Sequence, residues 1–224
     1  MKLFNVFRRT HYNNFDDIEG YDDIKNIVTR ALNSDENYNL LFTGPPASSK
    51  TLFLMGIMDR EKNCVYFDGS NSTNRMLDVL EEERPNIVCI DEIDKLPKQF
   101  QNKLLNLMEN GHVKVDQKNC QYDFEFKGLK VFATSNELNR LSKPLQSRFR
   151  RLNLPKYTHE QFLNVAITVC PKLKEEVAEM IGEEVWKQQG DIRDVISISK
   201  LVQKNDGPEE IAEIMATLNK YGDE

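Results

Sequence analysis

Residues 40–51 combine the groups that bind a triphosphate, with the sequence LLFTGPPASSKT. An apolar run is followed by a loop of small residues and then by a Lys-Thr pair that begins a helical pattern. Backbone N–H groups of such a loop and the N-terminus of the following helix bind phosphate oxygens, while lysine neutralises charge and a hydroxyl binds Mg²⁺. The segment therefore predicts a strand, a phosphate-binding loop and a helix. Ser49 stands where the pattern GxxxxGK(S/T) has its second glycine.

A second apolar segment, residues 87–94 with the sequence IVCIDEID, ends in acidic residues. Such a strand places carboxylates at the carboxyl edge of a parallel sheet, beside the phosphate loop. Asp91 would hold Mg²⁺ through water and Glu92 would activate the attacking water, two functions that phosphoryl transfer requires besides phosphate binding. An isolated acidic pair would more simply end a strand in solvent. Its position downstream of a phosphate loop favours the catalytic interpretation.

Three further polar positions have the chemistry to contact a reacting phosphate. Asn136 follows the apolar run 131–135, where its amide could bind the attacking water or the terminal phosphate. Arg148 lies in the cluster PLQSRFRR, and Arg193 opens a helical pattern in GDIR. Arginine suits developing phosphoryl charge because its fork is planar and permanently charged. The alternatives are an ordinary turn asparagine, a surface basic cluster and a solvated arginine at a helix start.

The elements that must position these residues alternate along the first two thirds of the chain. Apolar runs predict strands, and 3.6-residue periodicity predicts helices between them. Period-2 alternation on both sides of a polar turn predicts a β-hairpin over residues 112–127. This order favours an α/β fold with a doubly wound parallel sheet. The predicted strands are 38–43, 63–68, 86–91 and 129–134, and the predicted helices are 22–32, 51–60, 74–83 and 98–110.

From about Pro155 the pattern becomes helical, with no strand candidates. We therefore expect an α/β nucleotide-binding domain over 1–154, with a lead-in over 1–37, and a small helical domain over 155–224. The helical patterns of the second domain are 158–170, 172–188, 191–204 and 208–220.

Composition limits the class of protein further. The chain has 224 residues and a formal net charge of -6, which gives no support to a globally basic nucleic-acid binder but leaves a local basic groove open. It contains no apolar run near the roughly 20 residues of a membrane span and no signal-peptide pattern. Four scattered cysteines without a C-x-x-C pair argue against a disulfide framework or a zinc site. We expect a cytoplasmic protein without membrane contact.

The phosphate loop, the acidic strand end and the segments that hold Asn136, Arg148 and Arg193 follow one another in an order that resembles the AAA+ ATPase family. The resemblance covers nearly the whole chain, from FDDIEG at 15–20 to the last helical pattern. The resemblance implies a P-loop fold with a helical lid, which binds ATP and Mg²⁺ and hydrolyses ATP. It implies that the loop is the Walker A motif and binds the nucleotide through Gly44, Pro45, Pro46, Ala47, Ser48, Ser49, Lys50, Thr51 and Leu52. Because serine is small, we expect binding to survive at Ser49.

The resemblance also assigns roles outside the loop. Thr51 and Asp91 would hold Mg²⁺, and Glu92 would activate water. Asn136 would be sensor 1 and Arg193 sensor 2. Arg148 would be the arginine finger given to a neighbouring subunit, with Arg150 and Arg151 as alternatives, which makes a homo-oligomeric ring, expected to be a hexamer, part of the mechanism. Ile18 and Tyr21 would contact adenine, although burial against the lid explains them nearly as well.

The hairpin between residues 112 and 127 is similar to the insertion of the pre-sensor-1 hairpin clade. The passage from 131 to 162 is most similar to the RuvB Holliday-junction branch-migration ATPases. In that group a DNA-binding winged-helix domain normally follows the lid, whereas this chain ends with the lid pattern. The resemblance therefore implies that the DNA reader is absent or that a separate DNA-binding or adaptor subunit supplies it.

The sequence is compatible with three functions. A DNA motor would track the backbone with basic side chains, and the candidates are Lys114, Lys118 and Lys127 on the hairpin and Arg75. Taken singly, each is more simply a solvated charge, and Asp116, Asp123 and Glu125 on the hairpin weaken the DNA case. A protein remodeller similar to the MoxR group is the alternative, since the loop 69–75 lacks the aromatic residue of proteasome-type unfoldases. An ATP-switched assembly module is the third, disfavoured by the presence of Glu92, Asn136 and Arg148.

Overall fold

The structure is a computed structural model that describes residues 15, 18, 20–45, 48–71, 75–117, 120–126, 128–188, 190–202 and 206–221. The chain forms two compact units. The first contains most of the residues up to Pro155, and the second contains residues 156–224, with which Ile18, Gly20 and Ser48 are grouped.

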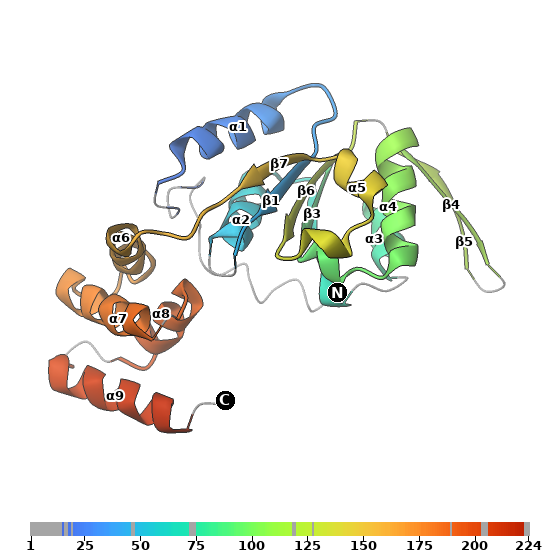
Figure 1. The fold of residues 1–224 in the computed structure, drawn as a ribbon. Coiled ribbons are helices and arrows are strands. Elements are labelled where there is room, and N and C mark those ends of the chain that lie inside the picture. Colours follow the sequence, from blue (N-terminus) through green and yellow to red (C-terminus); the bar gives the residue numbers. More distant parts are fainter. Residues whose placement is uncertain are drawn as a thin grey trace. The chain divides into compact units, whose positions relative to one another are not determined.

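The first unit is built on a five-stranded parallel sheet with the strand order β2-β3-β6-β1-β7 (Figure 1). This order places β1 between strands that come much later in the chain, and it confirms the predicted α/β class with a doubly wound parallel sheet. The carboxyl ends of all five strands lie at one edge. The strands are β1 (Leu40–Thr43), β2 (Cys64–Asp68), β3 (Ile87–Asp91), β6 (Lys130–Ser135) and β7 (Arg150–Asn153).

Strand β7 was not predicted from the sequence. Its four residues include two exposed arginines, so it lacks the apolar run that marks the other strands. It forms because β1 offers an open edge, where Leu40 pairs with Arg150 and Thr43 with Asn153.

Helices cover the sheet and connect its strands. The long helix α4 has the predicted bounds and ends at Gly111, whose φ of 64° and N–H bond to the Leu107 carbonyl (2.9 Å) make a left-handed C-cap. The helices are α1 (Asp22–Asn33), α2 (Lys50–Arg60), α3 (Arg75–Glu83), α4 (Lys98–Asn110) and α5 (Lys143–Ser147), and the 3-10 turns are η1 (Gly69–Asn71), η2 (Ile93–Lys95) and η3 (Leu138–Arg140).

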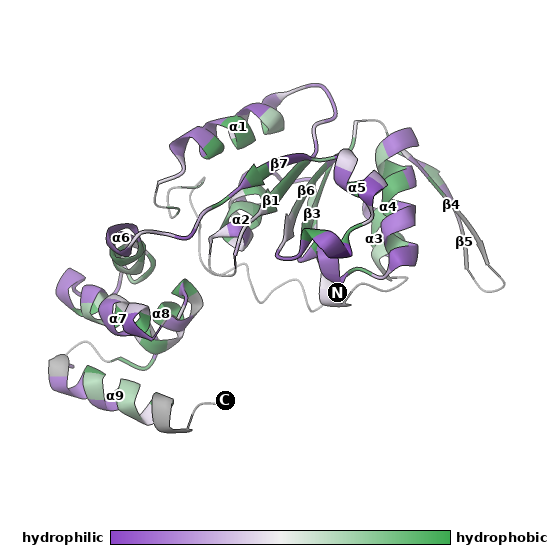
Figure 2. Ribbon diagram, viewed as in Figure 1, coloured by the Kyte–Doolittle hydropathy of each residue, from purple (hydrophilic) through white to green (hydrophobic). Residues whose placement is uncertain are grey.

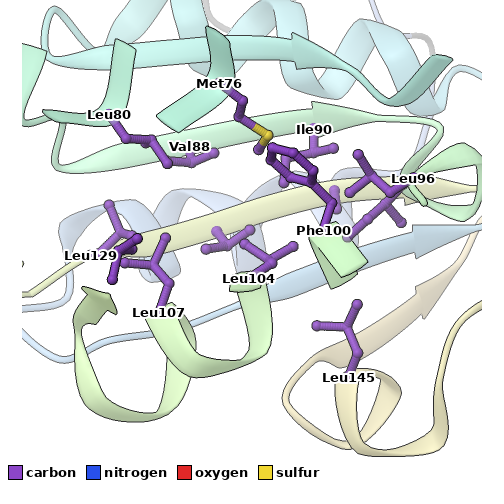
Figure 3. Close-up of a cluster of buried hydrophobic side chains, with 14 of the residues drawn as sticks. Met76, Leu80, Val88, Ile90, Leu96, Phe100, Leu104, Leu107, Leu129 and Leu145 are labelled. Carbon is purple, nitrogen blue, oxygen red and sulfur yellow. The ribbon is translucent and has the colours of Figure 1, made fainter. Parts of the chain in front are cut away.

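Buried aliphatic side chains of α3 and α4 pack against the central strands. Figure 3 shows Met76 and Leu80 of α3 beside Val88 of β3, with Leu104 and Leu107 of α4 in the same cluster. Helix α2 packs through Phe53, whose ring stacks on Phe42 of β1 with centroids 5.1 Å apart. Colouring by hydropathy shows these strands as mainly apolar and α4 as apolar on one side (Figure 2). This packing therefore fixes the positions of α2, α3 and α4 relative to the strands of the sheet.

An antiparallel hairpin, β4 (His112–Gln117) and β5 (Cys120–Glu125), follows α4 and confirms the hairpin prediction. Figure 1 shows it extending away from the sheet beyond α4. Its base is part of the core, since Val113, Tyr122 and Phe124 are buried. The Tyr122 hydroxyl donates to the Asp78 carboxylate on α3, and the Arg84 guanidinium lies 4.9 Å from the Phe124 ring centroid. The hairpin is thus anchored to α3 and the residue that follows it, and its base shares a hydrophobic cluster with Leu104 and Leu107 of α4.

The described part of the second unit is helical, with α6 (His159–Val169), α7 (Glu175–Lys187), α8 (Ile192–Ser199) and α9 (Pro208–Tyr221). Helix α6 starts with a capping box, in which Thr158 and Gln161 exchange side-chain and backbone hydrogen bonds. Its Phe162 ring packs on Trp186 of α7, with centroids 5.2 Å apart. Among the described residues, no helix has the length and apolar character that crossing a bilayer demands.

The packing of α2 predicts a measurable difference between two isoleucines. Ile57 on α2 is fully buried, whereas Ile27 on α1 is 40% exposed. Ile57→Ala should lower the free energy of unfolding by about 2–5 kcal/mol, because it removes buried apolar area and leaves a cavity behind the phosphate loop. Ile27→Ala, the matched control, should change it by less than about 1 kcal/mol. Urea denaturation followed by circular dichroism measures both, and equal effects would contradict this description of the core.

Candidate nucleotide site

The phosphate loop leads directly from β1 into the N-terminus of α2. Ser49 is the N-cap of α2 and has left-handed backbone angles, φ 59° and ψ 13°. Glycine adopts this conformation without strain, which is the physical reason for the usual glycine there, and serine adopts it at a modest cost. Pro46 and Ala47 lie outside the described residues. Gly44, Pro45 and Ser48 lie in the described part of the loop, and Leu52 follows in the first turn of α2.

The Lys50 ammonium is folded onto this loop. Its Nζ donates to the carbonyls of Gly44 (3.0 Å) and Pro45 (2.6 Å), and its side chain is buried. A buried ammonium needs such acceptors. Phosphate oxygens are stronger partners for it than neutral carbonyls, because both charges then contribute. The loop therefore holds a cation where a phosphate group can replace the carbonyls.

The Asp91 carboxylate at the end of β3 accepts hydrogen bonds from three hydroxyl groups. Thr51 of α2 donates to Oδ2 at 2.9 Å, Tyr66 of β2 donates to Oδ2 at 3.0 Å, and Thr134 of β6 donates to Oδ1. Burial, and then the charge of Asp91, raises the pKa of Tyr66, so its hydroxyl stays protonated and remains a donor. Neither Tyr66 nor Thr134 was identified from the sequence, because only the register of the sheet brings them to Asp91.

The oxygens of Thr51 and Asp91 fit Mg²⁺. Hydroxyl and carboxylate oxygens are the hard ligands that this ion prefers, and the two side chains are already in contact. Mg²⁺ bound there would withdraw electron density from the phosphate oxygens. The structure thus places both predicted metal ligands together, beside the loop lysine.

The turn after β3 holds the Glu92 backbone in a strained conformation. Glu92 has φ 50°, and its N–H donates to the Thr134 hydroxyl at 2.8 Å. Gly69 approaches from the end of β2 so closely that a Cβ on it would lie 2.2 Å from the Glu92 carbonyl oxygen. The turn therefore depends on a glycine that the sequence motifs do not mark. A non-glycine residue with positive φ is frequently found at a functional site.

The Glu92 carboxylate lies between an amide and an ammonium group. Asn136 Nδ2 donates to Glu92 Oε1 at 3.2 Å, and Lys95 Nζ lies 2.5 Å from Glu92 Oε2. The hydrogen bond to Glu92 raises the pKa of Lys95, which keeps this ammonium charged. The buried Asp94 accepts from the Asn136 N–H at 3.1 Å and so fixes the backbone of that residue. The i,i+3 spacing of Glu92 and Lys95 on a 3-10 turn was a signal available in the sequence.

Arg148 lies at the opposite edge of the sheet from these groups. Two residues after it, Arg150 pairs with Leu40, the first residue of β1, whereas Asp91 and Asn136 lie at or beyond the carboxyl ends of their strands. The Arg148 guanidinium pairs with Glu109 at the end of α4. The structure therefore brings Lys50, Thr51, Asp91, Glu92 and Asn136 together and leaves Arg148 apart within one subunit.

The remaining predicted residues are Ile18, Tyr21 and Arg193. Ile18 is buried, and Tyr21 donates its hydroxyl to the Pro155 carbonyl at 2.6 Å, with its pKa raised to about 12 by burial. Neither observation tests a contact with adenine. Arg193 lies in the first turn of α8, and its side chain is outside the described residues.

Comparison with known proteins agrees with this fold. The model of the AAA family, "ATPase family associated with various cellular activities", matches residues 40–156. A comparison with curated proteins returned no match. Among solved structures, a proline-to-glycine mutant of Thermotoga maritima RuvB is 21% identical, with a TM-score of 0.73 over 94% of this chain and 74% of that one. An alanine-to-serine mutant of the same protein is 20% identical, with a TM-score of 0.71 over 93% and 73%.

A P-loop beside paired acidic residues at the edge of a parallel sheet defines a nucleotide hydrolase of the P-loop class. The chain belongs to the AAA family of ATPases. It is an ATP-hydrolysing enzyme, and members of this family bind ATP, generally with Mg²⁺. The similarity to RuvB, at about one fifth identity, concerns the fold.

The contact between Tyr66 and Asp91 predicts a change in Mg²⁺ dependence. Tyr66→Phe removes one of the donors that orient Asp91, so the Mg²⁺ concentration for half-maximal ATP binding should rise about tenfold, as is typical when a group that orients a metal ligand is removed. Tyr38→Phe alters a 40% exposed tyrosine and is the matched control. Titration of Mg²⁺ at fixed ATP, followed by calorimetry, measures both. An unchanged Mg²⁺ requirement in Tyr66→Phe would contradict the orienting role.

Proposed function

We propose that this protein is a ring-forming ATPase motor that acts on DNA, with the hairpin β4–β5 as its DNA contact. The observation that carries the proposal is the path of α4. This helix begins three residues after Lys95, the partner of Glu92. At its other end only Gly111 separates it from β4. A rigid helix between the water-activating turn and the hairpin gives nucleotide hydrolysis a direct route to a substrate. The resemblance of residues 131–162 to RuvB-type ATPases supports DNA as that substrate.

In the proposed reaction each side chain has one task. Lys50 neutralises the terminal phosphates, while Thr51 and Asp91 hold the metal ion. Glu92 accepts the proton of the attacking water, and Asn136 orients that water together with Glu92. Because Arg148 is remote from these groups within its own subunit, we propose that it completes the site of a neighbour, which makes a ring, expected to be a hexamer, necessary for turnover. Arg193, Ile18 and Tyr21 stay predictions for the lid and the adenine base.

A protein-remodelling ATPase is the second candidate, and the charge of the hairpin favours it. The described, exposed side chains of β5 include Asp123 and Glu125, which would repel a phosphate backbone. His112 pairs with Asp123 at 2.6 Å and offsets part of this charge only when protonated. The structure describes the backbone of Lys114 on β4 and of Arg75 but not their side chains. Lys118 and Lys127 lie outside the described residues.

The role of Glu92 predicts a separation of binding from hydrolysis. Glu92→Gln keeps the size and the Asn136 contact but removes the base, so the turnover number should fall about 10²–10⁴-fold. The dissociation constant for ATP·Mg²⁺ should stay within about threefold, because the substituted group does not neutralise phosphate charge. Glu179→Gln, on the exposed side of α7, is the control. Steady-state phosphate release and calorimetry measure the two quantities, and an equal loss of both would contradict the assignment.

The proposed position of Arg148 in a neighbouring site predicts rescue between two inactive variants. Lys50→Ala subunits lack a phosphate-binding cation, and Arg148→Ala subunits lack the arginine that a neighbour needs. In a mixture, some interfaces pair an intact site with an intact Arg148, so ATP hydrolysis should recover to roughly one tenth or more of the wild-type rate. Phosphate release at several mixing ratios measures this. Absence of recovery at every ratio would show that Arg148 does not act in trans.

The DNA contact predicts a salt-dependent stimulation that depends on the hairpin lysines. Single-stranded, duplex and branched DNA should each be compared for their effect on the ATPase rate at increasing salt. Replacing Lys114, Lys118 and Lys127 together by serine should reduce the slope of log affinity against log salt for duplex DNA by about 3, roughly 0.9 for each phosphate that a lysine no longer neutralises. Replacing the exposed Lys62, Lys156 and Lys172 by serine is the charge-matched control.

If DNA stimulates both triple variants equally, the hairpin does not contact DNA. No stimulation by any DNA in the wild-type protein would favour the protein-remodelling candidate.

A further inference from the structure

The segment between Asn136 and Arg148 is bound by two glutamine side chains, Gln101 and Gln146. Gln101 lies on α4 and is only 2% exposed. Its Nε2 donates to the carbonyls of Leu96 (3.0 Å) and Arg140 (3.2 Å), and its Oε1 accepts from the Ser142 N–H (3.0 Å). One buried amide thus joins the start of α4 to the residues that precede α5.

Gln146, on α5, binds the same segment. Its Nε2 donates to the carbonyls of Leu138 (2.8 Å) and Leu141 (3.0 Å). Backbone groups that are shielded from water must find partners inside the protein. Because the two glutamines supply them at four residues of the segment, it cannot shift relative to α4 and α5 without breaking these bonds. The residues bound in this way are Leu138, Arg140, Leu141 and Ser142.

The start of α5 depends on Gln101 for a specific reason. Ser142 is the N-cap residue, a position at which a serine hydroxyl ordinarily binds the first free N–H groups of a helix. Here the side chain makes no cap hydrogen bond, and among the described residues its buried Oγ has no partner. Gln101 binds the N–H of Ser142 itself, so this hydrogen bond ties the residue at the start of α5 to α4.

Helix α4 also contacts the far end of the segment. Glu109 pairs with Arg148, and the buried Leu145 of α5 belongs to the same cluster as Leu104 of α4 (Figure 3). Gln101 and Glu109 are eight residues apart, which corresponds to about 12 Å along the helix axis. Helix α4 thus holds the segment at both ends.

We propose that Gln101 and Gln146 are positioning residues that set the location of Arg148 for its action on a neighbouring subunit. This inference rests on the proposed function, in which Arg148 completes the neighbour's site. It has a distinctive consequence. Loss of either glutamine amide should slow hydrolysis in the adjacent subunit and leave the nucleotide site of its own subunit largely intact.

The experiment places one substitution in either of two partner subunits. Gln101→Met removes the amide at similar length, and Gln99→Met, at an exposed position on the same helix, is the matched control. In mixtures of Lys50→Ala and Arg148→Ala subunits, the Lys50→Ala subunit supplies Arg148 and the Arg148→Ala subunit supplies the site. Gln101→Met in the Lys50→Ala subunit should reduce the recovered ATPase rate about tenfold, because small displacements of a catalytic group cost this much or more. In the Arg148→Ala subunit the change should stay within about twofold, as it should for Gln99→Met in either subunit.

Three results would overturn the inference. Equal loss in both placements would indicate a general structural defect, and loss only in the Arg148→Ala subunit would indicate action on the subunit's own Asn136. Failure of the mixture to assemble, measured by sedimentation, would also contradict it, because a positioning residue changes turnover and leaves assembly intact. If Gln101→Met does not fold by circular dichroism, Gln146→Met in the same two placements decides the question.

Failure of the proposed function has a different signature. The mixture without glutamine substitutions would then show no recovery, which removes the trans role of Arg148 and this inference with it. The three results above, in contrast, occur in mixtures whose unmodified form recovers activity.

Discussion

The hydrogen bonds of the Asp91 carboxylate are the interaction on which the nucleotide site depends. They join α2, β2 and β6 to the end of β3 through the hydroxyls of Thr51, Tyr66 and Thr134. The buried carboxylate requires such donors, since a charge without partners inside a protein is costly. Because Thr134 also accepts the Glu92 N–H, the same cluster fixes the backbone of Glu92, the residue that we propose activates water. The phosphate loop and Glu92 are therefore held by one set of hydrogen bonds.

Much of the fold could be predicted from the sequence, because its signals are local. The bounds of α4 follow from apolar periodicity and Gly111, and the hairpin follows from period-2 alternation around a polar turn. Strand β7 could not be predicted in this way. It owes its conformation to pairing with β1, and its own residues lack an apolar run.

The candidate site likewise contains residues that could be predicted from local motifs and residues that could not. The motif positions predict Lys50, Thr51, Asp91, Glu92 and Asn136 as site residues, and these side chains lie together in the structure. Tyr66 and Gly69 were not identified, because their importance comes from the register of β2 on β3, in which Tyr66 pairs with Cys89 and Asp68 with Asp91. Gln101 is similar, since a glutamine in a helical pattern carries no sign that its amide will bind a segment about 40 residues later. Residues that act through non-local contacts have no sequence spacing that would reveal them.

Strand β7 has a further consequence for the behaviour of the molecule in solution. Among the described residues it is the last strand on one side of the sheet, and such an edge can add a strand from another chain and start aggregation. The edge here is only four residues long and carries two exposed arginines, Arg150 and Arg151. Short length and charge are the features by which proteins discourage such pairing. The arginines next to Arg148 would then protect the sheet from uncontrolled association, a role that is independent of any nucleotide.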